Sequence, residues 1–443
     1  MQLKINKNNL VLFVILSTMI LPIMNFFGFG IPVIYLLTPL GIGILMLIMF
    51  GRVKIPRIVK VLLVIWFMIL FQIVVTTLYS TVNKLGYFVF PTDITQYVVR
   101  FVFLVSFIVI AYKGYIDKDK FINYFLIVLI MGMSIGILQW LPWIGREFLT
   151  NVYPFKDGID QLKNLDRPLH LIRIHGFAQH ATGNGGIASF ALVFGYCVKK
   201  YYKKYNILSL ILIMMSVINI FISQARAGML AAIFSIFLLY VVNIKYEKKG
   251  LKSTIYMLTL ISILALVVYY LYNSGNPYVV LAYDRWLNLF ETGGGARATT
   301  QPQYFFSMME SADYFFGLSK PIINRSLISY GIEIEPLNIF VTYGLVGFIF
   351  HYTLVAFLLM YFYKKISKKV EDKATLTLII ASFVGLFGYQ IFSVAYFFFR
   401  EIRIGLFPWV LMGVGIGLYE RYKLKGLSNK SKEIKLNNKG NSL

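Results

Sequence analysis

The sequence has few cysteines, histidines and acidic residues for its length. Its 443 residues include one cysteine, four histidines and 19 aspartates and glutamates. The single cysteine, Cys197, excludes a disulfide framework and a thiolate metal site. Charged residues make up only 14% of the chain whereas hydrophobic residues make up 58%, so the composition also excludes an ordinary soluble globular protein.

Long apolar runs fill most of the chain. A helix needs about 20 residues to cross the hydrocarbon core of a membrane. We therefore expect an all-α, polytopic membrane helix bundle with about twelve transmembrane helices. The predicted spans are residues 10–27, 31–50, 61–78, 94–112, 121–140, 184–198, 207–222, 229–244, 253–272, 338–363, 374–396 and 405–419. No small-residue cleavage site follows the first run, so we predict an uncleaved helix there rather than a signal peptide.

These spans predict one membrane domain over residues 1–422. Two long outer segments interrupt it, at about 141–183 and 273–337, and the larger one lies between spans 9 and 10. Loops of this length usually carry function. The second segment is expected to contain short helices, and its amphipathic run at residues 303–316 is expected to lie on the membrane surface. The polar tail, residues 423–443, is expected to lie in the cytoplasm and to be disordered.

Basic residues divide unequally between the two predicted sides. One side carries 29 lysines and arginines, of which only three are arginines, and such lysine clusters mark the cytoplasmic face, where both termini would lie. The other side carries 13, of which nine are arginines: Arg146, Arg167, Arg173, Arg226, Arg285, Arg297, Arg325, Arg400 and Arg403. Because the net charge of +24 follows this topology, it indicates contact with anionic lipid in the bilayer and no nucleic acid.

The outer arginines indicate a phosphate-bearing ligand, because a guanidinium holds phosphate with two parallel N–H bonds, better than lysine does. Arg226 lies in the tight connection 223–228 and should be recessed in the outer leaflet, facing a wet cavity or a partner. A purely structural role at the lipid interface is the alternative. Arg297 follows a glycine run that lacks the Lys-Ser/Thr of a nucleotide-binding loop.

Residues 173–186 form a second candidate for anion binding. Arg173, His175 and His180 precede a glycine-rich helix start, where free N–H groups and the helix dipole favour a negative charge. A flexible helix cap is the alternative. The two histidines are five residues apart and share no helical face, so we expect no zinc site.

Glu333 and Glu335, just before the tenth span, are candidates for the general base, although either can simply pair with an arginine. Arg100 lies inside an apolar run, where a charge is usually functional or part of a packed ion pair. No Asp-x-Asp motif occurs on the predicted outer side. We therefore expect no metal or other cofactor, with arginines stabilising a leaving group instead.

Four motifs follow one another in residues 170–350. They are R-x-x-G-F at 173–177, S-x-A-R-A-G at 223–228, the long segment from Arg297 to the F-G pair at 316–317, and N-x-F followed by Y-G-L-x-G at 338–347. Together they resemble the O-antigen polymerase and ligase superfamily, and Wzy-type polymerases of surface polysaccharides in particular.

The resemblance implies a glycosyltransferase at the outer face of the bacterial plasma (inner) membrane. It would join undecaprenyl-diphosphate-linked oligosaccharides, as donor and acceptor, into O-antigen or a capsular or exopolysaccharide by metal-independent inverting transfer. A chain-length regulator and a flippase of the same pathway are the expected partners. Ligases of the superfamily have a His-Asn pair where Leu337 precedes Asn338 here, which favours a polymerase. A ligase-type transferase and a flippase of the lipid-linked oligosaccharide remain the alternatives.

The resemblance also implies that Arg173, Arg226 and Arg297 engage the diphosphate. The predicted catalytic residues are Arg226, Arg297, Glu333 and Glu335, and the predicted substrate-binding residues are Arg173, His175, His180, Asn338 and Arg100.

Overall fold

The structure, a computed structural model, describes most of the chain: residues 7–26, 29–53, 55–153, 162–247, 250–292, 295–329, 331–367, 370–396 and 403–440. Within these ranges the only strands are β1 (Ile23–Phe26) and β2 (Phe29–Pro32), which pair antiparallel, and the regular structure is otherwise helical. The predicted all-α class is confirmed. Arg400, counted above among the outer arginines, lies outside the described residues.

Eight helices in the described part are long and apolar enough to cross a membrane, so the chain is a multi-pass membrane protein. An apolar stretch in lipid becomes helical because only an internal partner can satisfy each backbone N–H and C=O group. The eight are α3 (Arg57–Leu85), α4 (Ile94–Lys113), α5 (Lys118–Trp140), α8 (Ala181–Cys197) with the π-helical turn η3 (Val198–Tyr202), α9 (Asn206–Ser223), α10 (Arg226–Glu247), α16 (Glu335–Lys365) and α17 (Lys373–Ser393).

The other four predicted spans also overlap helices. These are α1 (Lys7–Ser17), η1 (Val33–Leu37) continued by α2 (Thr38–Met49), α11 (Gly250–Asn273) and α18 (Leu406–Gly440). The first two are shorter than the roughly 20 residues that a straight crossing needs. The count of twelve spans therefore stays a prediction.

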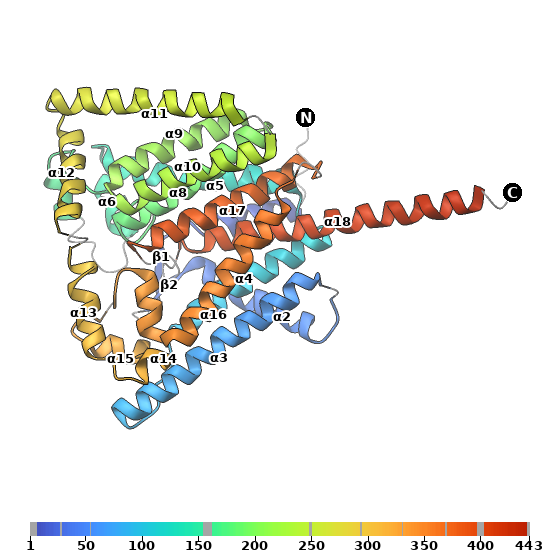
Figure 1. Cartoon of the computed structure of the whole chain (residues 1–443), viewed down its shortest axis with the longest axis horizontal. Coiled ribbons are helices and arrows are strands. Elements are labelled where there is room, and N and C mark those ends of the chain that lie inside the picture. Colours follow the sequence, from blue (N-terminus) through green and yellow to red (C-terminus); the bar gives the residue numbers. More distant parts are fainter. Residues whose placement is uncertain are drawn as a thin grey trace.

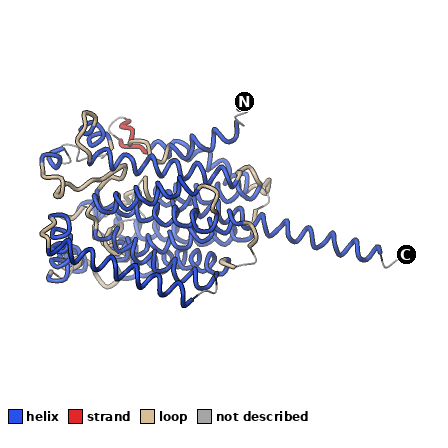
Figure 2. Tube along the Cα trace, turned by 90° about the horizontal axis from the view of Figure 1, so that it is seen from above, coloured by secondary structure: helices blue, strands red, loops and turns tan. Residues whose placement is uncertain are grey.

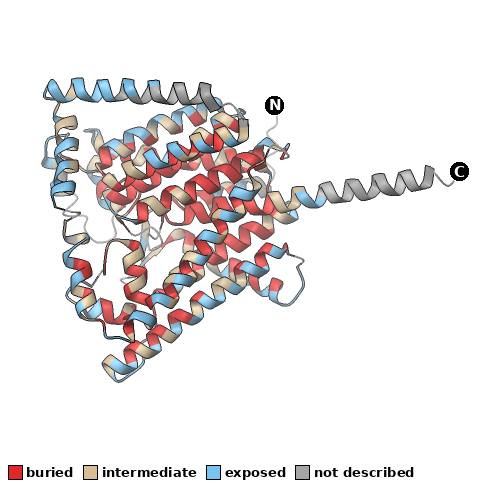
Figure 3. Ribbon diagram, in the orientation of Figure 1, coloured by how far each residue is buried: buried red, intermediate tan, exposed pale blue. Residues whose placement is uncertain are grey.

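The long helices run side by side, and most of the connecting segments gather at the two ends of the bundle (Figures 1 and 2). The spans α8 and α17 are the most enclosed, whereas α3, α9 and α16 lie at the periphery (Figure 3). The exposed side chains at the periphery are largely apolar, for example Phe67 and Phe71 on α3. Such a surface suits contact with lipid hydrocarbon.

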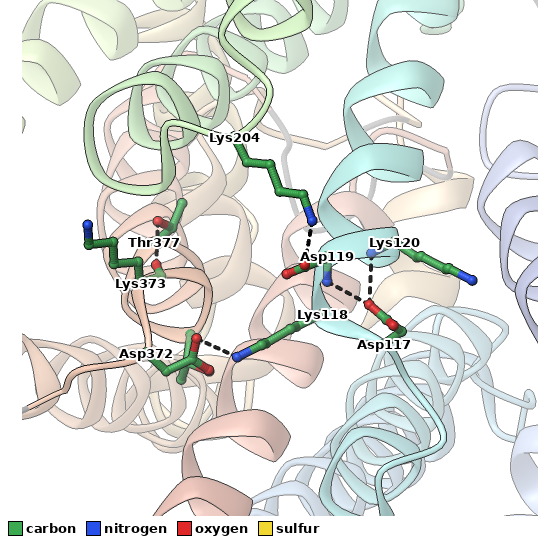
Figure 4. Close-up of polar contacts among 9 residues, drawn as sticks. Asp117, Lys118, Asp119, Lys120, Lys204, Asp372, Lys373 and Thr377 are labelled. Atoms are coloured by element: carbon green, nitrogen blue, oxygen red, sulfur yellow. Dashed lines mark hydrogen bonds and ion pairs between the residues drawn. The ribbon is translucent and has the colours of Figure 1, made fainter.

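Lysine ion pairs connect the helices at one end of the bundle. Lys118 Nζ lies 2.6 Å from Asp372 Oδ1 and joins α5 to the start of α17, while Lys204 Nζ lies 2.6 Å from Asp119 Oδ2 and joins the α8–α9 connection to α5 (Figure 4). Asp117 caps α5, because its Oδ1 accepts the backbone N–H of Asp119. We call this end, defined by these five residues, the lysine end.

The two long connections at the opposite end contain short helices. The first includes α6 (Arg146–Val152) and η2 (Asn164–Asp166); the second includes α12 (Pro277–Glu291), η4 (Gly295–Arg297), α13 (Thr300–Ser307), α14 (Asp313–Phe316) and α15 (Lys320–Arg325). In Figure 1, α12 and α13 cross the end of the bundle.

The second segment contains short helices, as expected, and the amphipathic run over residues 303–316 is divided between α13 and α14. The break is stabilised by Asp313, whose Oδ2 accepts the backbone N–H of Glu310 and lies 2.9 Å from Lys84 Nζ of α3. A buried carboxylate with these partners fixes the turn that interrupts the helix.

A kink in α16 holds the second long connection in place. Gly344 has a left-handed backbone (φ 66°), and the carbonyls of Val341 and Thr342 accept bonds from outside the helix. The backbone N–H groups of Leu318 and Ser319 donate to them, at 2.8 and 2.9 Å. A Cβ on Gly344 would lie 2.1 Å from a backbone oxygen of α14, so glycine is required here.

The C-terminal helix α18 continues as far as Gly440 and projects from the bundle (Figure 1). Residues 423–440 of the tail lie within this helix, and the disorder expected for residues 423–443 stays a prediction. A helix that continues from a packed membrane helix needs no new nucleus, which removes the main cost of forming it.

Candidate functional site

The connection between α9 and α10 places Arg226 at the first residue of α10. Gln224 has a left-handed backbone (φ 50°) and ends α9. Its Nε2 donates to the backbone oxygens of His170, at 2.7 Å, and Ile172, at 3.1 Å. These two bonds hold the segment that carries Arg173 beside the connection.

Glycines allow α8 to pack closely against the same connection. A Cβ on Gly228 would lie 2.5 Å from the carbonyl carbon of Gly185, so the two backbones touch. The glycine-rich helix start expected to receive an anion is thus buried in helix packing. Within this helix start, Thr182 lines the cavity described below.

Arg226 is bonded to α12, which carries a further arginine. Arg226 Nη1 donates to the backbone oxygen of Arg285 at 2.7 Å. Asn276 caps α12, because its side chain accepts the backbone N–H of Tyr278, and Pro277 is the first residue of the helix. This start signal sets α12 across the end of α10.

Arg297, the last residue of η4, forms an ion pair between its Nε and Glu333 Oε2. Its Nη1 also donates to the backbone oxygen of Ala395, after α17, at 3.4 Å. The backbone N–H of Glu333 donates to Oε1 of the buried Gln301 on α13, at 3.0 Å. The ion pair therefore joins η4 to the segment that leads into α16.

Four arginines line one cavity of about 920 Å³, within the range of ligand pockets. We call Arg173, Arg226, Arg285 and Arg297 the cavity arginines, and the end of the bundle that holds them the arginine end. Of the described residues that line the cavity, Asp284 is the one acidic residue. Positive charge therefore exceeds negative charge in this cavity.

Burial and mutual repulsion perturb the cavity arginines. Burial first, and then the charges of Arg285, Arg297 and Arg226, lower the pKa of Arg173 to about 10. Burial and then the charge of Arg226 lower the pKa of Arg285. Such groups remain protonated at pH 7, so a bound anion would relieve the repulsion between them.

The two predicted histidines lie outside the lining of the cavity. His175 is buried, with Nδ1 2.8 Å from the backbone oxygen of Gly176 and Nε2 3.2 Å from that of Thr150. Burial is the main cause that lowers the pKa of His175 to about 4. His180 precedes α8 and packs against the ring of Tyr396, with centroids 6.0 Å apart.

Three further predicted residues are buried in helices and also lie outside the described lining. Asn338 Nδ2 donates to the backbone oxygen of Ile332 at 2.7 Å and fixes the turn before α16. Glu335 is the first residue of α16 and is 4% exposed. Arg100 is buried in α4, where its Nη1 donates to the backbone oxygen of Gln96 at 3.0 Å. Their roles in binding or catalysis stay predictions.

Arg285 and Gln224 belong to the site but were not among the candidate residues from the sequence. Arg285 was one of the outer arginines, yet no motif distinguishes it. The Asn-Pro pair at residues 276–277 is a helix start signal that would have placed Arg285 on a helix of its own.

Comparison with known proteins adds no relative. A scan of the sequence against protein-family models finds no match, and a search of curated proteins finds no significant match. Among the described side chains, no group of three or more His, Cys, Asp or Glu can hold a metal ion. The chemistry that this arrangement can perform is therefore inferred from its guanidinium groups, which can bind and neutralise an anion of high charge density.

Proposed function

We propose that the chain is a Wzy-type polymerase of a bacterial surface polysaccharide. It joins undecaprenyl-diphosphate-linked repeat units at the outer face of the plasma membrane, in the topology of twelve spans with the lysine end in the cytoplasm. The observation that carries the proposal is the convergence of the four cavity arginines at the opposite end of a membrane helix bundle.

In the proposed reaction, a hydroxyl of the lipid-linked acceptor attacks the anomeric carbon of the donor. The bond from this carbon to the diphosphate oxygen breaks, the diphosphate leaves with the electron pair, and the configuration inverts. The cavity arginines neutralise the departing charge, and a well-placed donor of this kind typically contributes about 3 kcal/mol. Glu333 or Glu335 accepts the hydroxyl proton. The diphosphate bond supplies the free energy, so the proposal includes no nucleotide.

A flippase of the same lipid-linked unit is the second candidate. Arg100 favours it, because a charge buried within a membrane span often marks a transport pathway. The cavity arginines favour the polymerase, since they gather at one end of the bundle and not along its length. Leu337, in place of the histidine of ligases, disfavours the ligase-type transferase.

The test uses the purified full chain in lipid nanodiscs with its lipid-linked repeat unit, without nucleotide or added metal. We expect a ladder of longer lipid-linked products. Arg226→Lys and Arg297→Lys should reduce the ladder about 100-fold, because lysine cannot form the paired phosphate bonds. The matched control is Arg325→Lys, at an exposed arginine that bonds to Tyr87 Oη at 2.9 Å outside the cavity.

A repeat unit that remains single while it crosses the bilayer of proteoliposomes would identify a flippase and reject the polymerase. Full ladders from both lysine variants would remove Arg226 and Arg297 from the catalytic set. Loss of the ladder in Arg325→Lys to the same extent would show that the effect is not specific to the cavity.

A further inference from the structure

The cavity arginines differ in what already holds them. Arg226 bonds to a backbone oxygen, whereas Arg297 is paired with the carboxylate of Glu333. A carboxylate on a guanidinium occupies the same donor groups that a phosphate oxygen would use. Glu333 therefore stands where an anionic ligand would bind Arg297.

The position of Glu333 is fixed by its backbone, and its side chain is partly exposed. The backbone N–H of Glu333 donates to Oε1 of Gln301 at 3.0 Å, and this bond holds the Glu333 carboxylate beside Arg297. The side chains of Arg297 and Glu333 are 43% and 20% exposed, and Arg297 is the member of the pair that lines the cavity. An anion in the cavity can reach Arg297, because Arg297 itself lines the cavity.

The charges around the cavity also favour exchange. Four guanidinium groups face Asp284 on the lining and Glu333 beside it, which leaves an excess of two positive charges. A diphosphate esterified at both ends carries two negative charges. It matches this excess and offers several oxygens, whereas Glu333 offers two.

We infer that Glu333 is an internal substitute for the diphosphate, which the lipid-linked substrate displaces from Arg297 on binding. One set of N–H···carboxylate contacts breaks and one set of N–H···phosphate contacts forms, with no proton transferred. Glu333 then keeps Arg297 on the cavity wall until a diphosphate is present, and its released carboxylate stays available as a proton acceptor in the proposed reaction. The inference rests on the proposed function for the identity of the ligand, but the exchange itself can be measured without sugar transfer.

The test measures the affinity of the full chain in nanodiscs for inorganic pyrophosphate by calorimetry. Glu333→Gln should tighten binding about fivefold, because the ligand no longer competes with a carboxylate for Arg297. Glu333→Ala provides a second variant without the amide. Asp284→Asn is the matched control: it removes one negative charge from the cavity lining without touching the Arg297 pair, so its gain should be smaller.

A double-mutant cycle separates exchange from a general loss of negative charge. In the Arg297→Gln background, Glu333→Gln should give no gain in affinity, because the contact to be exchanged is gone. The inference is overturned if the gain persists in that background, or if Asp284→Asn gives the same gain as Glu333→Gln. If the double-mutant cycle gives the expected result but the lipid-linked substrate yields no ladder, the polymerase is rejected and the exchange at Arg297 stands. If the lipid-linked substrate yields a ladder but the double-mutant cycle does not give the expected result, only the exchange at Arg297 is rejected.

Discussion

Positive charge is handled differently at the two ends of the bundle. At the lysine end, Lys118 and Lys204 each lie 2.6 Å from a carboxylate, on side chains that are 43% and 51% exposed (Figure 4). At the arginine end, four guanidinium groups share one cavity, and burial and mutual repulsion lower the pKa of Arg173 and Arg285. At the lysine end each of these lysines has its own carboxylate, whereas the four cavity arginines share a cavity lined by one acidic residue. This excess of positive charge distinguishes a candidate binding site from a structural contact.

The largest expected effect concerns Arg285, which lines the cavity but belongs to no motif. Arg285→Gln should slow ladder formation by about 100-fold or more, because it removes one donor from the diphosphate and leaves the backbone bond to Arg226 in place. The measurement is the initial rate with the lipid-linked repeat unit in nanodiscs. A rate within threefold of the wild-type chain would show that the cavity functions with three arginines.

An intermediate effect is expected from acid, and it should be specific to the arginine end. The pKa of His175 is lowered to about 4, so the folded chain keeps it neutral while the unfolded chain binds a proton below pH 6.5. Acid therefore favours the unfolded chain, and the stability from this site, full at pH 7.5, should fall by about 2 kcal/mol at pH 5. Unfolding of the wild type and His175→Gln at both pH values measures it.

In the difference between the wild type and His175→Gln, the effect of pH on all other titratable groups cancels. The wild-type chain should lose about 2 kcal/mol more than His175→Gln on going from pH 7.5 to pH 5. An equal loss in both would mean that His175 is protonated in the folded chain, with both ring nitrogens donating to the carbonyls that face them.

The smallest effect is expected at the lysine end. Lys118→Ala breaks the pair with Asp372, which should change the free energy of unfolding by less than about 1 kcal/mol. The rate of ladder formation should not change, because the cavity lies at the other end. A loss of activity comparable to that of Arg285→Gln would remove the distinction between the two ends.

The fold class followed from the sequence because apolar length and helical backbone bonding dominate in a membrane. The same approach found three of the four cavity arginines, since Arg173, Arg226 and Arg297 lie in segments with glycines or tight connections that distinguish them from the surrounding residues. Arg285 was overlooked because α12 brings it to the cavity through a tertiary contact, the bond from Arg226 to its backbone.

Several other site residues could not be placed from the sequence. Nothing in the pattern shows that His175 is enclosed by backbone oxygens, or that Asn338 is turned toward the carbonyl of Ile332. Similarly, the pairing of Glu333 with Arg297 was one of two open possibilities. Side-chain direction at such positions depends on neighbours distant in the chain, which periodicity and spacing do not encode.

The joint between the second long connection and α16 is made by main-chain atoms, from Leu318 and Ser319 to the carbonyls beside Gly344. These main-chain hydrogen bonds do not depend on the side chains that flank them. Residues 320–329 can therefore diverge, or be exchanged for those of another protein with the same glycine, while Glu333 stays and Arg297 keeps its partner. A chimera made at these boundaries would transplant this part of the surface and retain the four cavity arginines.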